Sequence, residues 1–131
     1  MILGHGIDLV SIDRFVKMDL MRQDKLADRI LTDNELSNYR SHTTINSQAH
    51  YLAKIWAAKE AVSKSFGTGI QGVVVWKNIS IQNNELGCPV VTFNNELKKY
   101  ADGQKCHISI SHEGNSIIAS AILSRNNNSF N

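Results

Sequence analysis

The chain has 131 residues, of which 42% are hydrophobic and 20% charged, with one Pro and eight Gly. This length suits one globular domain with a single core, and the composition excludes a disordered, collagen-like or low-complexity chain. The net charge of +2, from 14 basic and 12 acidic residues, does not by itself indicate a nucleic-acid-binding protein. The two cysteines lie far apart and outside any Cys-x-x-Cys pair, which favours a reducing compartment.

No apolar stretch approaches the roughly 18 residues that are needed to cross a bilayer. The first ten residues lack a basic segment, and Asp8 interrupts their apolar run, which argues against a signal peptide. We therefore expect a soluble, cytoplasmic protein without a membrane partner.

The first predicted element is a strand over residues 2–12, where the side chain of Asp8 points to the face opposite that of Leu9. Gly4 and Gly6 weaken a strand, but they permit another backbone to approach closely. A charged side chain in mid-strand needs a partner if the strand is central, whereas at a sheet edge it would lie in solvent. Both interpretations of Asp8 are open at this point.

Helices follow the first strand. Residues 13–30 have a loose helical spacing, and Thr32 with Glu35 forms the pattern of a capping box that begins the next helix. After a polar loop over 41–47, residues 47–66 give the strongest helix, rich in Ala and in long unbranched side chains. A glycine directly after this helix provides its end.

The second half of the chain predicts short strands and a terminal hairpin. The expected strands lie at 73–76, 79–81, 90–93, 107–112 and 116–123, and the last two form the hairpin. Residues 94–101 suit a short helix, and a polar tail, 126–131, follows a single domain of residues 1–125. Because strands and helices mix without a regular β-α-β alternation, the predicted fold class is α+β, with a small antiparallel sheet packed with one long helix and shorter helices.

The long helix carries charged residues beside an apolar stripe. At 100° per residue, Lys59 falls near the middle of the stripe, while Glu60 and Lys64 lie along its edge. One interpretation is a lysine that extends its charged end to solvent beside a surface ion pair. The other is a cleft in which Glu60 binds a cation and the lysines contact phosphate. The spacing alone does not choose between them.

Three further features are candidates for a site. A carboxylate from the first strand, Asp8, together with one from the long helix would suit Mg²⁺, which takes one or two protein carboxylates beside water and phosphate oxygens. His112 is either an ordinary hairpin histidine or a phosphate contact or proton-transfer group. The Gly-Thr-Gly run at 67–69 is too short for a Walker loop, and it is either a simple turn or a place where a nucleotide approaches the backbone.

Together these segments closely resemble the holo-[acyl-carrier-protein] synthases, the short bacterial type of 4'-phosphopantetheinyl transferase. The resembling segments are G-H-G-I-D-L at 4–9, Arg14, R-I-L-T from 29 through Glu35, W-A-A-K-E-A at 56–61 with Lys64, F-G-T-G-I at 66–70 and I-S-I-S-H at 108–112. The match spans nearly the whole chain, in order. The combination of G-x-G-x-D with a W/F-A-x-K-E-A-x-x-K motif is specific.

The resemblance implies a transferase of fatty acid biosynthesis, which moves the phosphopantetheine arm of coenzyme A to a serine of apo-acyl carrier protein and releases adenosine 3',5'-bisphosphate. It implies Asp8 and Glu60 as magnesium ligands and Lys64 as a phosphate contact. The catalytic candidates are Glu60, Lys64 and His112, and the coenzyme A contacts are Lys59, Lys64, Gly67, Thr68, Gly69, Ser109 and His112. For the serine proton, the candidate bases are Glu60, a water bound to the metal, and His112.

The resemblance also implies partners. Arg14, with Arg22 and Lys25, would form a basic surface that docks the acidic carrier protein. Members of the family form trimers with sites between subunits, so that Asp8 and Lys64 of one site would come from different chains. The chain departs from many members at Ile55, where they carry Arg.

Two other functions were weighed against this one. A non-catalytic module that binds coenzyme A or a nucleotide would be favoured by loss of a metal carboxylate, but both carboxylates are present. An RNA-binding protein using residues 14–29 is disfavoured, because three aspartates interleave with the basic residues and Phe15 is the one aromatic. We therefore expect no nucleic-acid partner.

Overall fold

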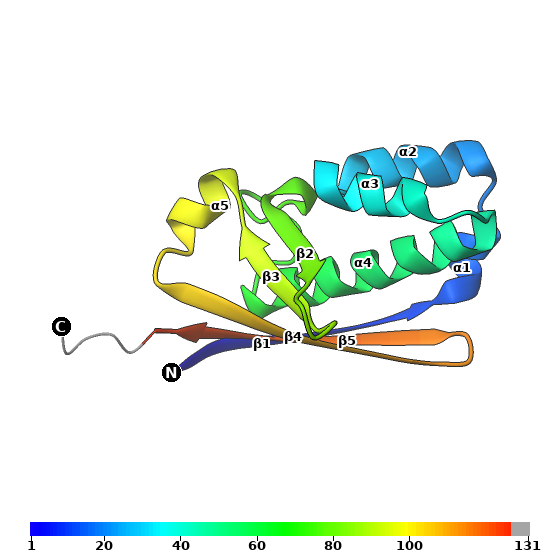
Figure 1. Ribbon diagram of the computed structural model, residues 1–131. Helices are drawn as coiled ribbons and strands as arrows, with labels where there is room; N and C mark the ends of the chain where they lie inside the picture. The colour runs from blue at the N-terminus through cyan, green and yellow to red at the C-terminus, as the bar shows by residue number, and fades with distance from the viewer. Residues whose placement is uncertain (127–131) are drawn as a thin grey trace.

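The computed structural model describes residues 1–126, and its largest unit is a three-stranded antiparallel sheet beneath one long helix (Figure 1). The helix is α4 (Ile45–Ser65). The strands are β1 (Ile2–Ser11), β4 (Gln104–Glu113) and β5 (Ser116–Arg125), in the spatial order β1-β5-β4. The N-terminal strand and the C-terminal hairpin therefore form one sheet, with β1 at its edge.

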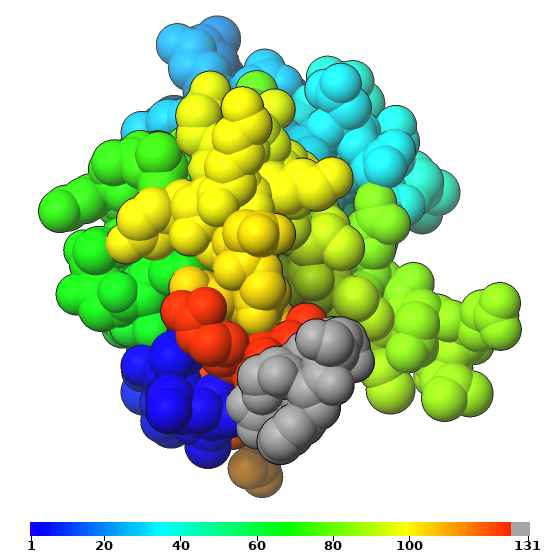
Figure 2. All heavy atoms as spheres, turned by 90° about the vertical axis from the view of Figure 1, so that its left-hand side faces the viewer, coloured from blue at the N-terminus to red at the C-terminus, as the bar shows by residue number. Residues whose placement is uncertain are grey.

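The remaining elements cover the side of α4 that faces away from this sheet (Figure 1). They are α1 (Ile12–Val16), α2 (Leu20–Ile30), α3 (Asp33–Ser41), the 3-10 helix η1 (Trp76–Asn78), β2 (Ile79–Asn83), β3 (Pro89–Phe93) and α5 (Asn95–Tyr100). β2 and β3 form a second, two-stranded antiparallel sheet, and the turn between them projects from the body of the molecule (Figure 2). The predicted α+β class, with small antiparallel sheets and one long helix, is confirmed.

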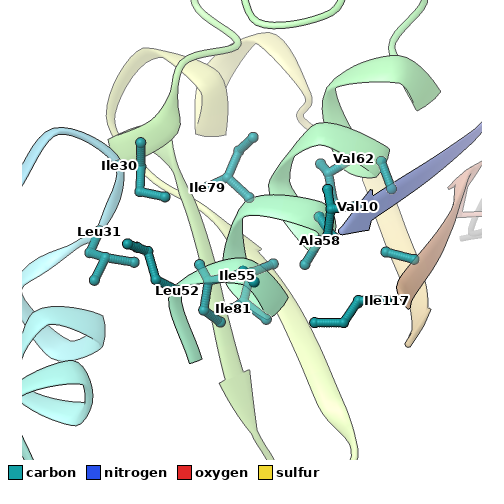
Figure 3. Packing of buried hydrophobic residues seen from close by; sticks show 14 of the residues in the cluster. Val10, Ile30, Leu31, Leu52, Ile55, Ala58, Val62, Ile79, Ile81 and Ile117 are labelled. Atoms are coloured by element: carbon teal, nitrogen blue, oxygen red, sulfur yellow. The ribbon is translucent and has the colours of Figure 1, made fainter. Parts of the chain in front are cut away.

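The core lies on both sides of α4 (Figure 3). On the sheet side it contains Val10, Ala58, Val62 and Ile117, and on the other side Ile30, Leu31, Leu52, Ile55, Ile79 and Ile81. Each fully buried aliphatic side chain of this size contributes about 1.5–3 kcal/mol. Because α4 is packed on two sides, its apolar surface is wider than the single stripe that the sequence suggested.

β1 packs so closely on α4 that two positions require glycine. A Cβ atom at Gly6 would lie 2.0 Å from the carbonyl oxygen of Ala61, and one at Gly4 would lie 1.9 Å from that of Ser65. The predicted close approach of another backbone is confirmed. Asp8, two residues after Gly6, points to the same face of the strand and is therefore turned toward α4.

The structure differs from the predicted elements in three places. The predicted helix over 13–30 is two helices, because Asp19 accepts a hydrogen bond from the Arg22 N–H at 2.9 Å and starts α2 as its N-cap. The predicted loop before the long helix is shorter, since Thr44 caps α4 two residues earlier than expected. Residues 73–76 form no strand, because the chain there makes one isolated bridge before η1.

The predicted polar tail lies outside the described residues except for Asn126, whose N–H donates to the Gly103 carbonyl oxygen at 3.0 Å. None of the helices within residues 1–126 is both long and apolar enough to cross a membrane. Cys88 is exposed and Cys106 is buried, and neither forms a disulfide.

Candidate functional site

Two carboxylates approach each other where β1 runs along α4. Asp8 lies on an edge strand, but its side chain is only 13% exposed because it faces the helix. Burial and, after it, the negative charge of Asp8 raise the pKa of Glu60, while the positive charges of Lys64 and Arg14 act in the opposite direction. The two carboxylates are thus within electrostatic reach of each other and share a partly desolvated position.

Lys64 joins β1 to α4. Its ammonium group donates to Asp8 Oδ1 and to the carbonyl oxygen of Ile7, both at 3.0 Å. Of the two interpretations of Glu60 and Lys64, the surface ion pair between them is wrong, since no ion pair joins them within residues 1–126. The expectation that Asp8 and Lys64 of one site come from different chains is also wrong, because they meet within one chain. The Lys64 side chain is 48% exposed, so it still reaches solvent.

The second oxygen of Asp8, Oδ2, is buried and has no hydrogen-bond partner in the described part of the chain. A carboxylate oxygen in this state is costly unless a positive group satisfies it. Together with Glu60 it fits a cation. Residues 1–126 contain no group of three or more His, Cys, Asp or Glu side chains that would hold a metal alone. Two carboxylates suit Mg²⁺, which retains water and phosphate ligands, and do not suit structural zinc, which takes four protein ligands.

Lys59 does not belong to this site. Its side chain is fully buried, and its ammonium group donates to Glu35 Oε1 at 2.6 Å, to the Ile30 carbonyl at 2.6 Å and to the Trp76 carbonyl at 2.9 Å. Three acceptors use all three protons of an ammonium group. The expected phosphate contact by Lys59 is therefore wrong. The alternative, in which Lys59 extends its ammonium group to solvent, is also wrong.

Glu35 completes this buried ion pair and links segments that are distant in the sequence. Its Oε1 also accepts from the Thr32 N–H at 2.9 Å, which confirms the predicted capping box, and its Oε2 accepts from the Ile81 N–H at 2.6 Å. Sequence reasoning found the cap but not the ion pair. A glutamate at the third helical position indicates a capping role. No neighbouring residue in the sequence indicates that the same carboxylate also pairs with Lys59.

The predicted docking residues lie on the two helices that follow β1. Arg14 is exposed on α1, and it is close enough to Glu60 for its positive charge to oppose the rise in the pKa of that carboxyl. Arg22 and Lys25 are exposed on α2. The structure therefore places one basic residue beside the carboxylates and two on the neighbouring helix.

A groove of about 630 Å³ opens between the N-terminal half of α4, the end of β4 and the β2–β3 hairpin. His112 lies at its wall, on the sheet face turned toward α4, together with Lys54, His50 and Tyr51. The groove is not lined by Asp8, Glu60 or Lys64. Sequence reasoning missed this groove, because Lys54 and His50 belong to no motif that distinguishes them from ordinary surface residues.

The predicted site residues thus fall into three places. The loop at 67–69 follows the C-terminal end of α4, where the Gly67 N–H donates to the Lys64 carbonyl at 2.9 Å. His112 lies in the groove. Ser109 is on the opposite face of the sheet, where it pairs in register with Ser120. One chain does not bring all of the predicted residues together.

The sheet face that carries Ser109 is not covered by any element within residues 1–126. Its large apolar side chains are exposed: Ile7 by 51%, Leu9 by 67%, Ile118 by 39% and Ile122 by 37%. An apolar patch of this kind, on the face opposite the core, is typical of a surface that contacts another protein.

The chain was compared with known proteins. Residues 4–121 match the family model described as the 4'-phosphopantetheinyl transferase superfamily. Among curated proteins it is 39% identical to a holo-[acyl-carrier-protein] synthase of Staphylococcus carnosus over 125 residues, covering 95% of this chain and 99% of that protein. It is 44% identical to that of Streptococcus thermophilus over 126 residues, covering 96% and 98%.

Solved structures agree with this match. The holo-[acyl-carrier-protein] synthase of Neisseria meningitidis superposes with a TM-score of 0.86 at 34% identity, covering 95% of this chain and all of that one. The synthase of Bacillus anthracis, solved in complex with CoA (3',5'-ADP), gives a TM-score of 0.81 at 32% identity, covering 96% and 99%.

Proposed function

The chain belongs to the holo-[acyl-carrier-protein] synthase family of the 4'-phosphopantetheinyl transferase superfamily, and from this premise we propose how its residues carry out the reaction. The reaction transfers the phosphopantetheine arm of coenzyme A to a serine hydroxyl of apo-acyl carrier protein and releases adenosine 3',5'-bisphosphate. The observation that carries the proposal is the juxtaposition of Asp8, Glu60 and Lys64 beside an uncompensated carboxylate oxygen.

Asp8 and Glu60 hold a magnesium ion in this proposal. The unpartnered Asp8 Oδ2 and the raised pKa of Glu60 support it, because one is a buried oxygen without a donor and the other is a partly buried carboxyl beside a second carboxylate. When bound, magnesium neutralises charge on the pyrophosphate oxygens, which is the main requirement of phosphoryl-group cleavage. Lys64 is held in place by Asp8 and by the Ile7 carbonyl, and it contributes a second positive charge for the same phosphates.

The metal assignment has a test that does not depend on activity. Magnesium binding should raise the melting temperature of the wild-type protein. In Asp8→Asn and in Glu60→Gln this shift should be lost, together with transfer activity, while the circular dichroism spectrum stays that of the folded protein. A variant that keeps full activity and the magnesium shift would remove its residue from the site.

The serine hydroxyl must lose a proton, and the protein groups that qualify as the base are Glu60 and His112. The pH dependence of the rate separates them. If His112 is the base, His112→Ala changes the pH dependence of the rate, while magnesium still stabilises the protein. If the profile is unchanged, the assignment passes to Glu60.

The site is completed between subunits of a homotrimer. The uncovered apolar sheet face supports this assembly, and so does the separation of His112 from the carboxylates within one chain. The groove of one subunit, with His112 and Lys54, would then face the carboxylates of its neighbour and take up part of coenzyme A. Sedimentation equilibrium tests the assembly. A mixture of inactive Glu60→Gln and His112→Ala chains that regains activity would demonstrate the shared site.

Arg14, Arg22 and Lys25 dock the acyl carrier protein. Their exposure on adjacent helices supports this role, and an acidic partner would meet them faster at low ionic strength. Arg14→Glu should weaken use of the carrier protein while coenzyme A still binds. Loss of both together would instead indicate misfolding or a broken subunit contact.

The decisive experiment for the function is the intact mass of an apo-acyl carrier protein after incubation with this protein, coenzyme A and magnesium. A gain of one phosphopantetheine that EDTA abolishes would establish the donor, the reaction and the metal requirement. No gain with several carrier proteins, while coenzyme A binds, would favour a non-catalytic binding protein. The carrier protein and coenzyme A meet in the cytoplasm, where we place this enzyme.

A further inference from the structure

Arg14 is held by aromatic rings and not by a carboxylate. Its guanidinium carbon lies 4.9 Å from the ring centroid of Trp56 and 5.3 Å from that of Phe15. Within residues 1–126 it forms no ion pair, although it stands close enough for its charge to oppose the rise in the pKa of Glu60. The guanidinium group is therefore oriented by its stacking contacts, while its five N–H donors stay available to a ligand.

A second tryptophan supports this arrangement from another part of the chain. The ring of Trp76, on η1, packs against Trp56 with centroids 4.7 Å apart and an interplanar angle of 33°. Phe15 is fully buried, and its ring meets Trp56 edge to face at 6.0 Å. Trp56 thus touches Arg14, Phe15 and Trp76, whereas Trp76 makes no cation–π contact with Arg14 itself.

The backbone of Trp76 is also fixed. Its carbonyl oxygen accepts a hydrogen bond from Lys59 at 2.9 Å, and Lys59 is anchored by the buried carboxylate of Glu35. Trp76 is consequently held in place, and its ring supports the Trp56 ring on which the exposed Arg14 lies. The order of contacts runs from the buried ion pair through Trp76 and Trp56 to Arg14.

We propose that Trp76 is a positioning residue for carrier-protein recognition, acting through Trp56 on Arg14. The inference rests on the proposed docking role of Arg14. A free arginine side chain has many rotamers, and binding a partner restricts them at a cost in free energy. When the guanidinium already lies on a supported tryptophan ring, part of that ordering is complete before an acidic side chain of the carrier arrives.

Steady-state kinetics with each substrate varied separately tests the proposal. Trp76→Leu should raise KM for the apo-acyl carrier protein by up to about 2- to 5-fold, the range reached if Trp56 shifts and its cation–π contact with Arg14 is lost. The value of kcat and KM for coenzyme A should not change, because Trp76 does not line the groove and its ring packs on Trp56, not on Asp8 or Glu60. Trp76→Phe keeps an aromatic ring and should restore most of the wild-type KM.

A double-mutant cycle with Arg14→Ala decides whether the effect passes through Arg14. Once Arg14 is absent, adding Trp76→Leu should raise KM for the carrier protein no further. If Trp76→Leu has the same effect with and without Arg14, the proposal is overturned. If KM for coenzyme A rises as much as KM for the carrier, Arg14 serves coenzyme A, and the proposal is likewise overturned.

Phe93→Leu is the matched control. It removes one ring from a different aromatic pair, Phe66 and Phe93, whose centroids lie 5.4 Å apart and which does not contact Arg14. Its ratio of the two KM values should equal that of the wild type. If Trp76→Leu does not fold, Trp76→Met, whose unbranched side chain adapts better to an irregular space, replaces it in the same cycle. Failure of the proposed function would appear differently, as absence of transfer in the wild type.

Discussion

Replacing Gly6 by Ala should lower both the stability and the activity of this protein. The new Cβ atom would lie 2.0 Å from the Ala61 carbonyl oxygen, 2.7 Å from the Ser65 amide nitrogen and 2.9 Å from the Lys64 Cβ. Real Cβ contacts are essentially never below 3.0 Å, so β1 and α4 must separate by about 1 Å. Two of the three obstructing atoms belong to the helix backbone, which cannot rotate away as a side chain would.

Overpacking of this kind typically costs about 1–3 kcal/mol, and a backbone obstacle places Gly6→Ala at the upper end. Alanine also restricts the unfolded chain, which stabilises the folded protein by about 0.4–1 kcal/mol. The free energy of unfolding should therefore fall by about 2 kcal/mol. With an unfolding entropy of roughly 2.1 cal/mol/K per residue, this corresponds to a fall in melting temperature of about 7 °C. Because Asp8 lies two residues further on the same face, a shift of about 1 Å should also reduce the transfer rate about 100-fold.

The assay is thermal unfolding followed by circular dichroism at one fixed protein concentration, with transfer activity measured on the same samples. Gly72→Ala is the control, since Gly72 has a φ of +62° but open space around its Cβ position. It should lose only about 1 kcal/mol, from the left-handed conformation, and keep its activity. If Gly6→Ala is as stable and as active as the wild type, the close contact between β1 and α4 does not position Asp8.

Three further predictions concern charged and polar groups. Lys59→Met leaves Glu35 buried without its cation and should cost about 3–5 kcal/mol in urea unfolding; a loss near zero would contradict the burial of that pair. Glu60→Gln should raise the melting temperature of the magnesium-free protein at pH 7–8, because burial and the charge of Asp8 raise the pKa of Glu60. A protonated Glu60 does not destabilise the fold, whereas an ionised Glu60 does, so its unfavourable effect appears as the pH rises from the unfolded-state pKa through the folded-state pKa. The gain in melting temperature from Glu60→Gln should therefore vanish below about pH 4. A gain that persists there would refute this cause. Gln23→Met should raise the free energy of unfolding by about 1 kcal/mol, since both amide atoms of Gln23 are buried without a partner in the described chain; a decrease in the urea midpoint would refute this.

Local features of the fold could be predicted because their causes are close together in the sequence. The alternation around Asp8, the capping box of Thr32 with Glu35, and the glycine that ends α4 each depend on a few neighbouring residues. The break between α1 and α2 was missed for a related reason. The cap at Asp19 competes with a loose apolar period that continues across it, and a single hydrogen bond decides the outcome.

Long-range pairing could not be predicted in the same way. Lys59 was expected at a phosphate or in solvent, yet it lies fully buried with Glu35, 24 positions earlier in the chain. For Lys64 the spacing left open an ion pair with Glu60 one turn away or a phosphate contact, and the structure pairs it with Asp8, 56 positions away. In both cases packing of another element brought within reach an acceptor that the neighbouring residues did not indicate.

The sequence by itself determined the elements, the class of fold and the residues that carry the family motifs, since these follow from propensity, periodicity and residue identity. Only the tertiary structure decided which charges meet: Asp8 and Lys64 beside Glu60, Lys59 with Glu35, and Arg14 on Trp56 and not on a carboxylate. The physical reason is that the free-energy contribution of a charged side chain depends on its burial and on its nearest partner. Both are set when β1, the short helices and η1 close around α4.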